Sequence, residues 1–326
     1  MKTKACVLYA QEDLRIEERE IGEMGPRQVL VRVGAGGVCG SDIHYYWEGG
    51  IGTIRVTEPI VMGHEAAGTV EAVGAEVTRV RPGERIAISP SRPCDHCKFC
   101  LSGEQQHCLN MQFFGSAMRK PHCHGAFRRH LIAEEHQCIP VGDAVSVEEA
   151  ACTEPLAVGV HAVNQAGSLF GKRIRVTGVG PIGSLLIGAA RAAGAGEIVA
   201  MDISEAPLKA ALAMGADVAI NSALEPERLA ADYSADKGYF DIGFECTGVG
   251  AVLKQFFPVM RPRSRIVQVG VMASADIPMN ALVGKEISLV GTHRFHREYA
   301  QAARLIREGK VDVKPVITSV LPMERA

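Results

Sequence analysis

The 326-residue sequence lacks an excess of charge of either sign. Lys and Arg total 35 residues against 37 Asp and Glu, which leaves a net charge of −2. Proteins that bind nucleic acid usually carry a surplus of cations, because the phosphates must be neutralised. We therefore expect no nucleic-acid partner.

Aromatic residues and long apolar stretches are also scarce. Aromatic residues make up 5% of the chain, with a single Trp. No stretch reaches about 18 apolar residues without charge, so no membrane-spanning helix is expected. The first residues contain no apolar segment ahead of a small-residue cleavage site, so no secretory signal is expected either. These features favour a cytoplasmic protein whose thiols stay reduced.

Ten cysteines are present, and four of them lie in one segment. Cys94, Cys97, Cys100 and Cys108 are separated by two, two and seven residues. In a reducing compartment this pattern is typical of a structural Zn²⁺ site, in which four thiolates fill the coordination shell. The alternatives are four unrelated thiols or an iron–sulfur cluster, although the spacing differs from that of bacterial clusters.

A second group of metal-ligand residue types is spread over separate Gly-rich segments. A catalytic zinc needs three protein ligands of mixed type and one open position, which Cys39, His64 and a glutamate would supply. Taken singly, a Cys or His is more often an ordinary buried or surface residue. Glu154 is a further acidic candidate, and its simpler explanation is a carboxylate at a helix start, where Pro155 also fits.

The pattern of apolar residues changes near residues 145–155. Before this point, short apolar runs broken by Gly and Pro predict strands at residues 29–33, 68–73 and 85–88. After it, strands alternate with Ala-rich helical stretches, which is the βαβ pattern of a parallel sheet. The strands predicted there are residues 173–177, 197–201, 242–246 and 266–269. A helix is expected over 297–309, and an extended run after residue 313.

A glycine-rich turn joins the strand at 173–177 to a helical stretch. Gly178 permits a tight turn, Gly180 allows the backbone to approach a pyrophosphate, and Gly183 allows close contact between helix and strand. Pro181 and Ile182 complete the motif at the helix N-terminus, where a diphosphate binds.

Asp202 ends the next predicted strand, 24 residues after Gly178. A carboxylate at this place accepts hydrogen bonds from ribose hydroxyls and repels a 2′-phosphate, so NAD is favoured over NADP. No Arg follows it to bind that phosphate. A cap on the following helix is the alternative role of Asp202.

With these motifs in order, the sequence resembles the zinc-dependent medium-chain alcohol dehydrogenase family, in its polyol dehydrogenase branch, over essentially the whole chain. The resemblance implies an α/β protein with a GroES-like β-barrel catalytic domain, formed by residues 1–149 and 289–326. It also implies a Rossmann domain, a doubly wound parallel sheet that binds NAD, over residues 150–288.

The resemblance also implies roles for the metal ligands. It assigns one catalytic zinc to Cys39 and His64, completed by Glu65, and one structural zinc to the four-cysteine segment. Glu154 would be an alternating ligand or a partner of the metal-bound water. Ser41 would accept the alcohol proton and His44 would pass it to solvent, although a turn serine and a surface histidine are the simpler explanations.

The resemblance implies oxidation of a secondary alcohol in a polyol or sugar acid, with L-idonate favoured and sorbitol, xylitol or L-threonine as alternatives. A sugar acid carries a carboxylate, so a cation should bind it. The resemblance implies Arg294, which stands in an Arg-aromatic pair, as the first choice, with Arg119 and Lys120 behind it. Tyr45 and Phe114 would line the pocket unless core packing explains them.

The resemblance further implies a homo-oligomer, a tetramer or a dimer. Family members normally continue for about twenty residues more, so a shortened C-terminus is expected. Two readings from other classes remain: a non-catalytic nucleotide-binding sensor, and a zinc module for nucleic acid, which the few cations near the four cysteines disfavour.

Overall fold

The computed structural model describes residues 1–325, which form two compact units. The first unit contains residues 1–154, 299–308 and the segment from Ile317 onward, and the second contains residues 155–298 and 309–316. The expected domain boundaries differ at three places. Residues 150–154 belong to the first unit, whereas residues 289–298 and 309–316 belong to the second. Residues 289–298 do so because β18 (Ser288–Gly291) pairs in parallel with its neighbour in that unit's sheet.

The first unit is rich in antiparallel strands. Its main sheet has five strands in the order β11-β3-β7-β8-β12, and a three-stranded sheet has the order β2-β1-β6. The strands are β1 (Lys2–Ala10), β2 (Asp13–Glu20), β3 (Gln28–Gly37), β4 (Gly50–Ile51), β5 (Ile54–Arg55), β6 (Ile60–Val61), β7 (Glu65–Val73), β8 (Arg85–Ile88), β9 (Ser91–Arg92), β10 (Gln112–Phe113), β11 (His130–Glu134) and β12 (Cys138–Pro140).

Alternation of apolar residues explains the core of this unit. Val29 and Val31 of β3 point to one face and are fully buried, as are Ile86 and Ile88 of β8. The helices of the unit are short: α1 (Gly40–Glu48), α2 (Lys98–Leu101), α3 (Val147–Ala151) and α11 (Glu298–Arg307). The last of these lies within the helix expected over 297–309.

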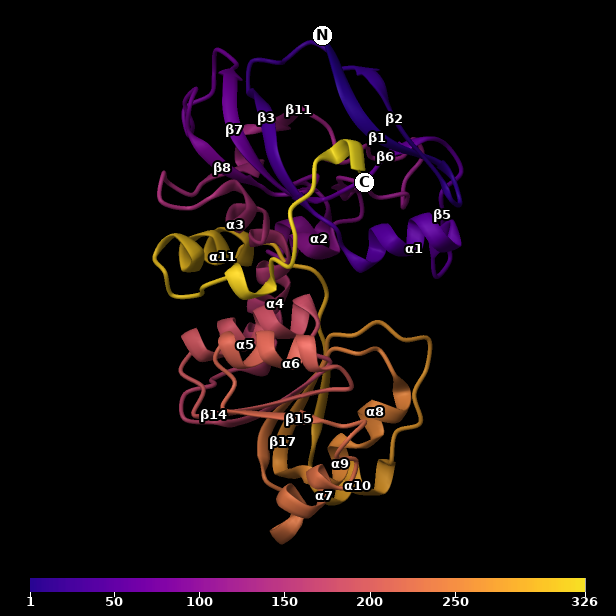
Figure 1. Ribbon diagram of the computed structural model, residues 1–326, viewed down its shortest axis with the longest axis vertical. Coiled ribbons are helices and arrows are strands. Elements are labelled where there is room, and N and C mark those ends of the chain that lie inside the picture. The colour runs from indigo at the N-terminus through magenta and orange to yellow at the C-terminus, as the bar shows by residue number, and fades with distance from the viewer. Residues whose placement is uncertain (326) are drawn as a thin grey trace. The chain divides into compact units, whose positions relative to one another are not determined.

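The second unit is built on a six-stranded parallel sheet with the order β15-β14-β13-β16-β17-β18. Its strands are β13 (Arg173–Thr177), β14 (Glu197–Asp202), β15 (Val218–Asn221), β16 (Phe240–Glu245), β17 (Met260–Gln268) and β18. Figure 1 shows α5 and α6 on one side of this sheet and α7, α9 and α10 on the other. The helices are α4 (Thr153–Ala166), α5 (Pro181–Ala192), α6 (Glu205–Ala213), α7 (Arg228–Tyr233), α8 (Gly250–Lys254), α9 (Phe256–Val259) and α10 (Met279–Gly284).

The β-rich first unit and the doubly wound parallel sheet confirm the predicted fold class, and every predicted strand except the closing run is present. That run was wrong: between Val313 and Arg325 the chain forms the short 3₁₀ helices Lys314–Val316 and Met323–Arg325 and no strand. Pro315 and Pro322 lack the N–H that a ladder requires, which disfavours pairing here. Among residues 1–325, no helix combines the length and hydrophobicity that crossing a bilayer demands.

Candidate active site

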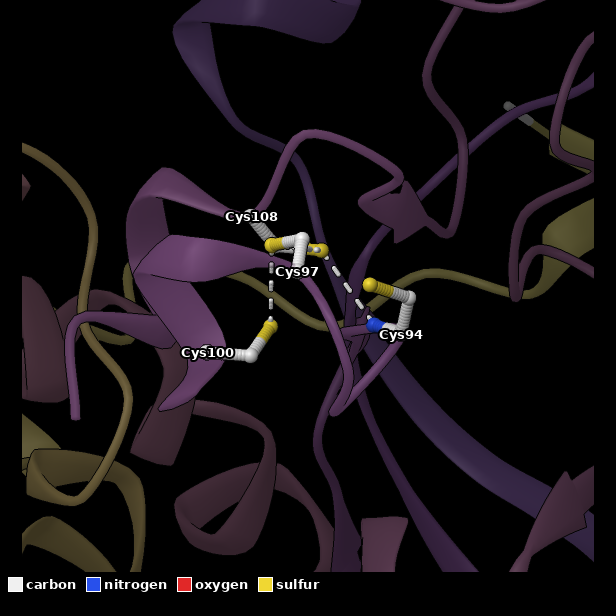
Figure 2. A group of neighbouring side chains, drawn as sticks. All are labelled: Cys94, Cys97, Cys100 and Cys108. Carbon is white, nitrogen blue, oxygen red and sulfur yellow. Dashed lines mark hydrogen bonds between the residues drawn. The ribbon is translucent and has the colours of Figure 1, made fainter. Parts of the chain in front are cut away.

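Within the part of the chain that the structure describes, two groups of at least three ligand-type side chains are close enough to share a metal ion. The first is the four-cysteine group, Cys94, Cys97, Cys100 and Cys108 (Figure 2). Its sulfur atoms come from the turns around α2, a single turn of helix that places Cys100 three residues after Cys97. All four Sγ atoms lie within 4.8 Å of one another.

The sulfur spacing in this group matches a zinc tetrahedron. Sγ of Cys97 lies 3.5 Å from Sγ of Cys100 and 4.0 Å from Sγ of Cys108. For zinc–sulfur bonds of about 2.3 Å, the edges of such a tetrahedron are about 3.8 Å long. All four thiols are free of disulfides, and a disulfide would need sulfurs only about 2.05 Å apart.

The electrostatics of the four-cysteine group also fit a cation. The N–H groups of His96 and Cys97 donate to Sγ of Cys94 and lower its pKa to about 6. Burial, together with the neighbouring thiols of Cys108 and Cys97, raises the pKa of Cys100 to about 12. Backbone N–H groups of Cys94 and Asn110 lie 3.2 and 3.3 Å from Sγ of Cys108 and orient it. A divalent cation would remove the repulsion that opposes full deprotonation.

The second group consists of Cys39, His64 and Glu65, whose ligand atoms lie within 4.8 Å of one another. Pairing of β3 with β7 brings them together, because Gly37 at the end of β3 lies opposite Glu65 at the start of β7. Cys39 then caps the N-terminus of α1, while His64 directly precedes β7. His64 and Glu65 are both buried.

Gly37 is required by the position of the Glu65 carboxylate. A Cβ atom at Gly37 would collide with Oε2 of Glu65. The glycine therefore allows the carboxylate to lie over the backbone beside Cys39.

Asp42, which the sequence analysis did not single out, orients this second group. One of its carboxylate oxygens accepts the backbone N–H of Cys39 at 3.0 Å, and the other accepts the N–H of Gly63 at 3.2 Å. The same side chain lies 3.8 Å from Nδ1 of His64 and is itself buried. A signal was available in the sequence, because Asp42 is the third residue of α1 and forms a capping box with Cys39.

Without a cation, burial disfavours the ionised forms of the side chains in the second group. Burial and the charge of Glu65 raise the pKa of Cys39 to about 12, against the hydrogen bonds from Ser41. Burial and the charge of Asp42 raise the pKa of Glu65 to about 7. One thiol, one imidazole and one carboxylate form a mixed donor set that suits zinc and leaves a fourth position for water or substrate.

The other predicted catalytic residues lie around this group in the first unit. Ser41 hydrogen-bonds to the Cys39 thiol through its side chain and backbone. Glu154 is buried and its charge acts on Cys39, although it is not one of the three clustered ligands. His44 is exposed on α1, with Nδ1 2.8 Å from the Glu48 carboxylate.

The aromatic residues and cations predicted to bind substrate have varied surroundings. Tyr45 is a core residue whose hydroxyl accepts the N–H of Ala117, so packing accounts for it. Phe114 packs against the core of the main sheet, whereas Phe113, which was missed, contacts the His64 ring at 5.7 Å between centroids. The Arg119 guanidinium donates to the carbonyls of Met111 and Leu109, a structural role.

Arg294 belongs to the second unit, after β18, and Lys120 precedes a cis proline in the first. Arg294 has φ of 50°, a left-handed conformation that is rare outside glycine and concentrates at functional sites.

The second unit carries the glycine turn at the carboxyl end of β13. Gly178 has φ of +82°, and a Cβ there would lie 2.7 Å from Cγ2 of Thr247. A Cβ at Gly183 would collide with the carbonyl oxygen of Gly178, so this glycine permits the contact between α5 and β13. Gly180 faces open space at the N-terminus of α5, where Pro181 is the first helical residue and Ile182 the second. The free N–H groups and open space fit a diphosphate.

Asp202 ends β14 beside this turn. One carboxylate oxygen accepts the N–H of Val179 at 2.9 Å, and the other accepts the N–H groups of Ile203 and Ser204. Ser204, not Asp202, occupies the N-cap of α6, so the simple capping role is wrong. The carboxylate thus holds the glycine turn and keeps lone-pair capacity for a ribose hydroxyl.

Comparison with known proteins identifies the family. The model of the alcohol dehydrogenase GroES-like domain matches residues 25–169, and that of the zinc-binding dehydrogenase matches residues 181–308. The chain is 40% identical over 324 residues to L-idonate 5-dehydrogenase (NAD(P)(+)) of Escherichia coli K12, covering 99% of this chain and 92% of that protein. The chain belongs to the zinc-dependent medium-chain alcohol dehydrogenase family.

Further relatives of this alcohol dehydrogenase agree. Sorbitol dehydrogenase of Gallus gallus is 37% identical over 327 residues, covering 99% of this chain and 90% of that protein. The crystal structure of the Escherichia coli L-idonate 5-dehydrogenase superposes with a TM-score of 0.90, covering 97% of this chain and 90% of that one. The chain is therefore an oxidoreductase that acts on alcohols, and the sensor and nucleic-acid alternatives find no support.

Proposed function

We propose that this dehydrogenase interconverts L-idonate and 5-keto-D-gluconate with NAD. The observation that carries the proposal is the clustering of Cys39 with the buried His64 and Glu65, a mixed set of three donors that leaves a fourth coordination position of zinc open. The relationship to L-idonate 5-dehydrogenase directs the choice of substrate. Oxidation of a neutral polyol is the second candidate, because sorbitol dehydrogenases are also similar to this chain.

Cys39, His64 and Glu65 would hold the catalytic zinc. The charge of Glu154 acts on Cys39, so Glu154 would serve as an alternating zinc ligand or as a partner of the metal-bound water. Bound zinc supplies a Lewis acid that lowers the pKa of a substrate hydroxyl. Cys94, Cys97, Cys100 and Cys108 would hold a structural zinc, since their four sulfurs fill its shell.

The remaining residues handle the proton and the nucleotide. Ser41 accepts the alcohol proton, and His44, which is exposed and paired with Glu48, passes it to solvent. The turn from Gly178 to Gly183 binds the diphosphate of NAD, and Asp202 accepts a ribose hydroxyl and repels a 2′-phosphate. Arg294 neutralises the substrate carboxylate. We also propose a cytoplasmic location, because both metal groups require reduced thiols. A homo-oligomer is proposed on the family resemblance alone.

A substrate screen tests the proposal. Purified protein would be assayed with L-idonate, sorbitol, xylitol and L-threonine, with NAD and NADP, and zinc would be measured on the same sample. We expect two zinc ions per chain and the highest kcat/KM with L-idonate and NAD. Faster turnover of a neutral polyol would overturn the assignment of L-idonate.

Arg294→Gln sharpens the same test. The KM for L-idonate should rise by about ten-fold or more, because a charged group loses its partner, while the KM for sorbitol should change little. Arg297→Gln, an exposed arginine close in sequence, is the matched control and should leave both values unchanged. An equal rise for both substrates would exclude carboxylate recognition by Arg294.

A further inference from the structure

Two side chains of opposite charge are completely buried on neighbouring strands of the parallel sheet. Arg175 of β13 and Glu245 of β16 are each 0% exposed. In the register of these strands, Thr177 lies opposite Glu245 and Arg175 lies opposite Gly243. Since side chains alternate along a strand, Arg175, Thr177 and Glu245 point to the same face of the sheet.

The contacts of Arg175 lead to the end of β13. Its Nε donates to the Thr177 hydroxyl at 2.9 Å, and Nη1 donates to the carbonyl of Gln255 at 2.9 Å. Its guanidinium carbon lies 3.8 Å from the centroid of the Phe256 ring. A Cβ at Gly243 would approach that ring within 2.6 Å, so glycine makes room for the stack. Nη2 is buried with no hydrogen-bond partner in residues 1–325.

The contacts of Glu245 lead to the ends of β16 and β17. One carboxylate oxygen accepts the N–H of Thr247 at 2.8 Å and also its hydroxyl. The other accepts the N–H of Gly248 at 3.0 Å and the side-chain amide of Gln268 at 2.5 Å. A single buried carboxylate therefore joins the turn after β16 to the last residue of β17.

These contacts converge on the place where such sheets bind ligands. The strand order reverses between β13 and β16, and open α/β sheets bind their ligands at the carboxyl ends of the strands on either side of that point. Thr177 immediately precedes Gly178, and Gly178 packs against Thr247. Arg175 and Glu245 thus support the two turns that meet at this crevice.

Stability alone is a poor reason for this arrangement. Burying charged groups costs free energy, and apolar side chains of similar volume often serve a core equally well or better. Burial lowers the pKa of Arg175 to about 9, and the charge of Glu245 opposes that shift. The unused donor on Nη2 shows that hydrogen bonding does not fully offset the cost of burial.

We propose that Arg175 and Glu245 act together as positioning residues that hold the turns after β13 and β16 in the geometry that binds the nicotinamide dinucleotide. The proposal rests on the proposed function, since it concerns the same nucleotide. Neither side chain touches the nucleotide, because both lie beneath the surface. They act through Thr177 and through the backbone N–H groups of Thr247 and Gly248.

Equilibrium binding of NADH, followed by its fluorescence, tests the proposal on the full chain. Arg175→Met and Glu245→Gln keep side-chain volume and remove charge. Each should raise the Kd for NADH by about ten-fold or more, as expected when a buried charged group loses its partner. The double variant should bind about as weakly as either single variant, because the two residues act as one unit.

A matched control exists on the same two strands. Arg173 of β13 and Asp241 of β16 pair at the opposite, amino edge of the sheet, with Nε 3.4 Å from Oδ2. Arg173→Met and Asp241→Asn should leave the Kd within two-fold of the unaltered chain. An equal rise in Kd for both pairs, in proportion to their loss of Tm, would reduce Arg175 and Glu245 to ordinary stabilising residues.

The remaining outcomes are also decisive. Folded Arg175→Met and Glu245→Gln with Kd values within two-fold of the unaltered chain would overturn the positioning role. If neither folds, Thr177→Val decides, because it removes only the acceptor of Arg175 Nε: a rise above two-fold supports the role, and a smaller change overturns it. Failure of the unaltered chain to bind NADH would overturn the proposed function itself.

Discussion

The two metal-ligand groups of the first unit differ in how the chain brings them together. The four cysteines lie within fifteen residues around one turn of helix, and their sulfurs meet through local geometry. Cys39 lies 25 residues before His64, and the two approach only because β3 pairs with β7. The first group offers four identical donors, which would fill the coordination shell of a zinc ion, whereas the second offers three different donors.

This difference in donors suits the four-cysteine group to a structural role and the group of Cys39, His64 and Glu65 to catalysis. A shell of four thiolates leaves no position for substrate, so its free energy of binding goes into holding the loop. A mixed set of three ligands leaves a position open, and it requires outside support from residues such as Asp42 to keep its geometry. Variants in each group should therefore affect different properties.

The largest effect is expected from Cys39→Ser. Loss of the soft ligand should lower kcat/KM by about a thousand-fold or more, because Lewis-acid stabilisation is worth several kcal/mol. Zinc content should fall by one ion per chain while Tm changes little. Cys123→Ser, a thiol outside both groups, is the control and should retain activity and zinc. Loss of both ions from Cys39→Ser would contradict the separation of the two sites.

Cys100→Ser should lower stability and leave kcat largely unchanged, the reverse of the effect of Cys39→Ser. Loss of a structural metal ligand should lower the free energy of unfolding by more than about 4 kcal/mol, measured by chemical denaturation. Below its lowered Tm, the folded fraction should keep most of its kcat. Ser102→Ala in the same loop removes only hydrogen bonds to Phe99 and Glu104 and should cost about 1 kcal/mol. An inactive but fully stable Cys100→Ser would reverse the assignments of the two groups.

Asp42→Asn should lower the zinc affinity of the group of Cys39, His64 and Glu65 and leave that of the four-cysteine group unchanged. An amide cannot accept from both Cys39 and Gly63 as the carboxylate does, so zinc affinity should fall by about 10- to 100-fold. Competition with a chelator would measure this loss, and the ion of the four-cysteine group should be retained. Asp13→Asn, at a half-buried acid paired with Arg15 and far from both groups in sequence, provides the comparison and should change neither affinity. Unchanged zinc affinity in Asp42→Asn would exclude the orienting role.

The smallest effect is expected from His44→Gln. Because His44 is exposed, water can replace part of its proton transfer, so kcat should fall by less than about ten-fold. Its contact with Glu48 lies on the surface and is worth about 0.5 kcal/mol or less, so Tm should be nearly unchanged. The informative measurement is the pH profile of kcat. A profile identical to that of the unaltered chain would remove His44 from the proton relay.

The four-cysteine group and the glycine turn could be predicted from the sequence because their chemistry is contiguous. Spacing alone placed Cys94 to Cys108, and the order of strand, turn and helix placed Gly178 to Gly183. Phe113 escaped because its contact is with His64, which is distant in the chain. Asp42 escaped although its capping box with Cys39 is local, because its contacts with Gly63 and His64 are not. For Tyr45 the sequence left pocket lining and core packing open, since burial in a core is a property of packing.

The sequence by itself determined the fold class, the four-cysteine site and the nucleotide turn, because spacing and periodicity act over a few residues. The family resemblance implied Glu65 as the third ligand, and the tertiary structure shows its carboxylate clustered with Cys39 and His64, because the pairing of β3 with β7 sets which carboxylate comes near. The tertiary structure also decided that β18 joins the parallel sheet and that Arg175 and Glu245 lie beneath the nucleotide turns. Long-range pairing and burial are properties of the folded chain, and no local pattern specifies them.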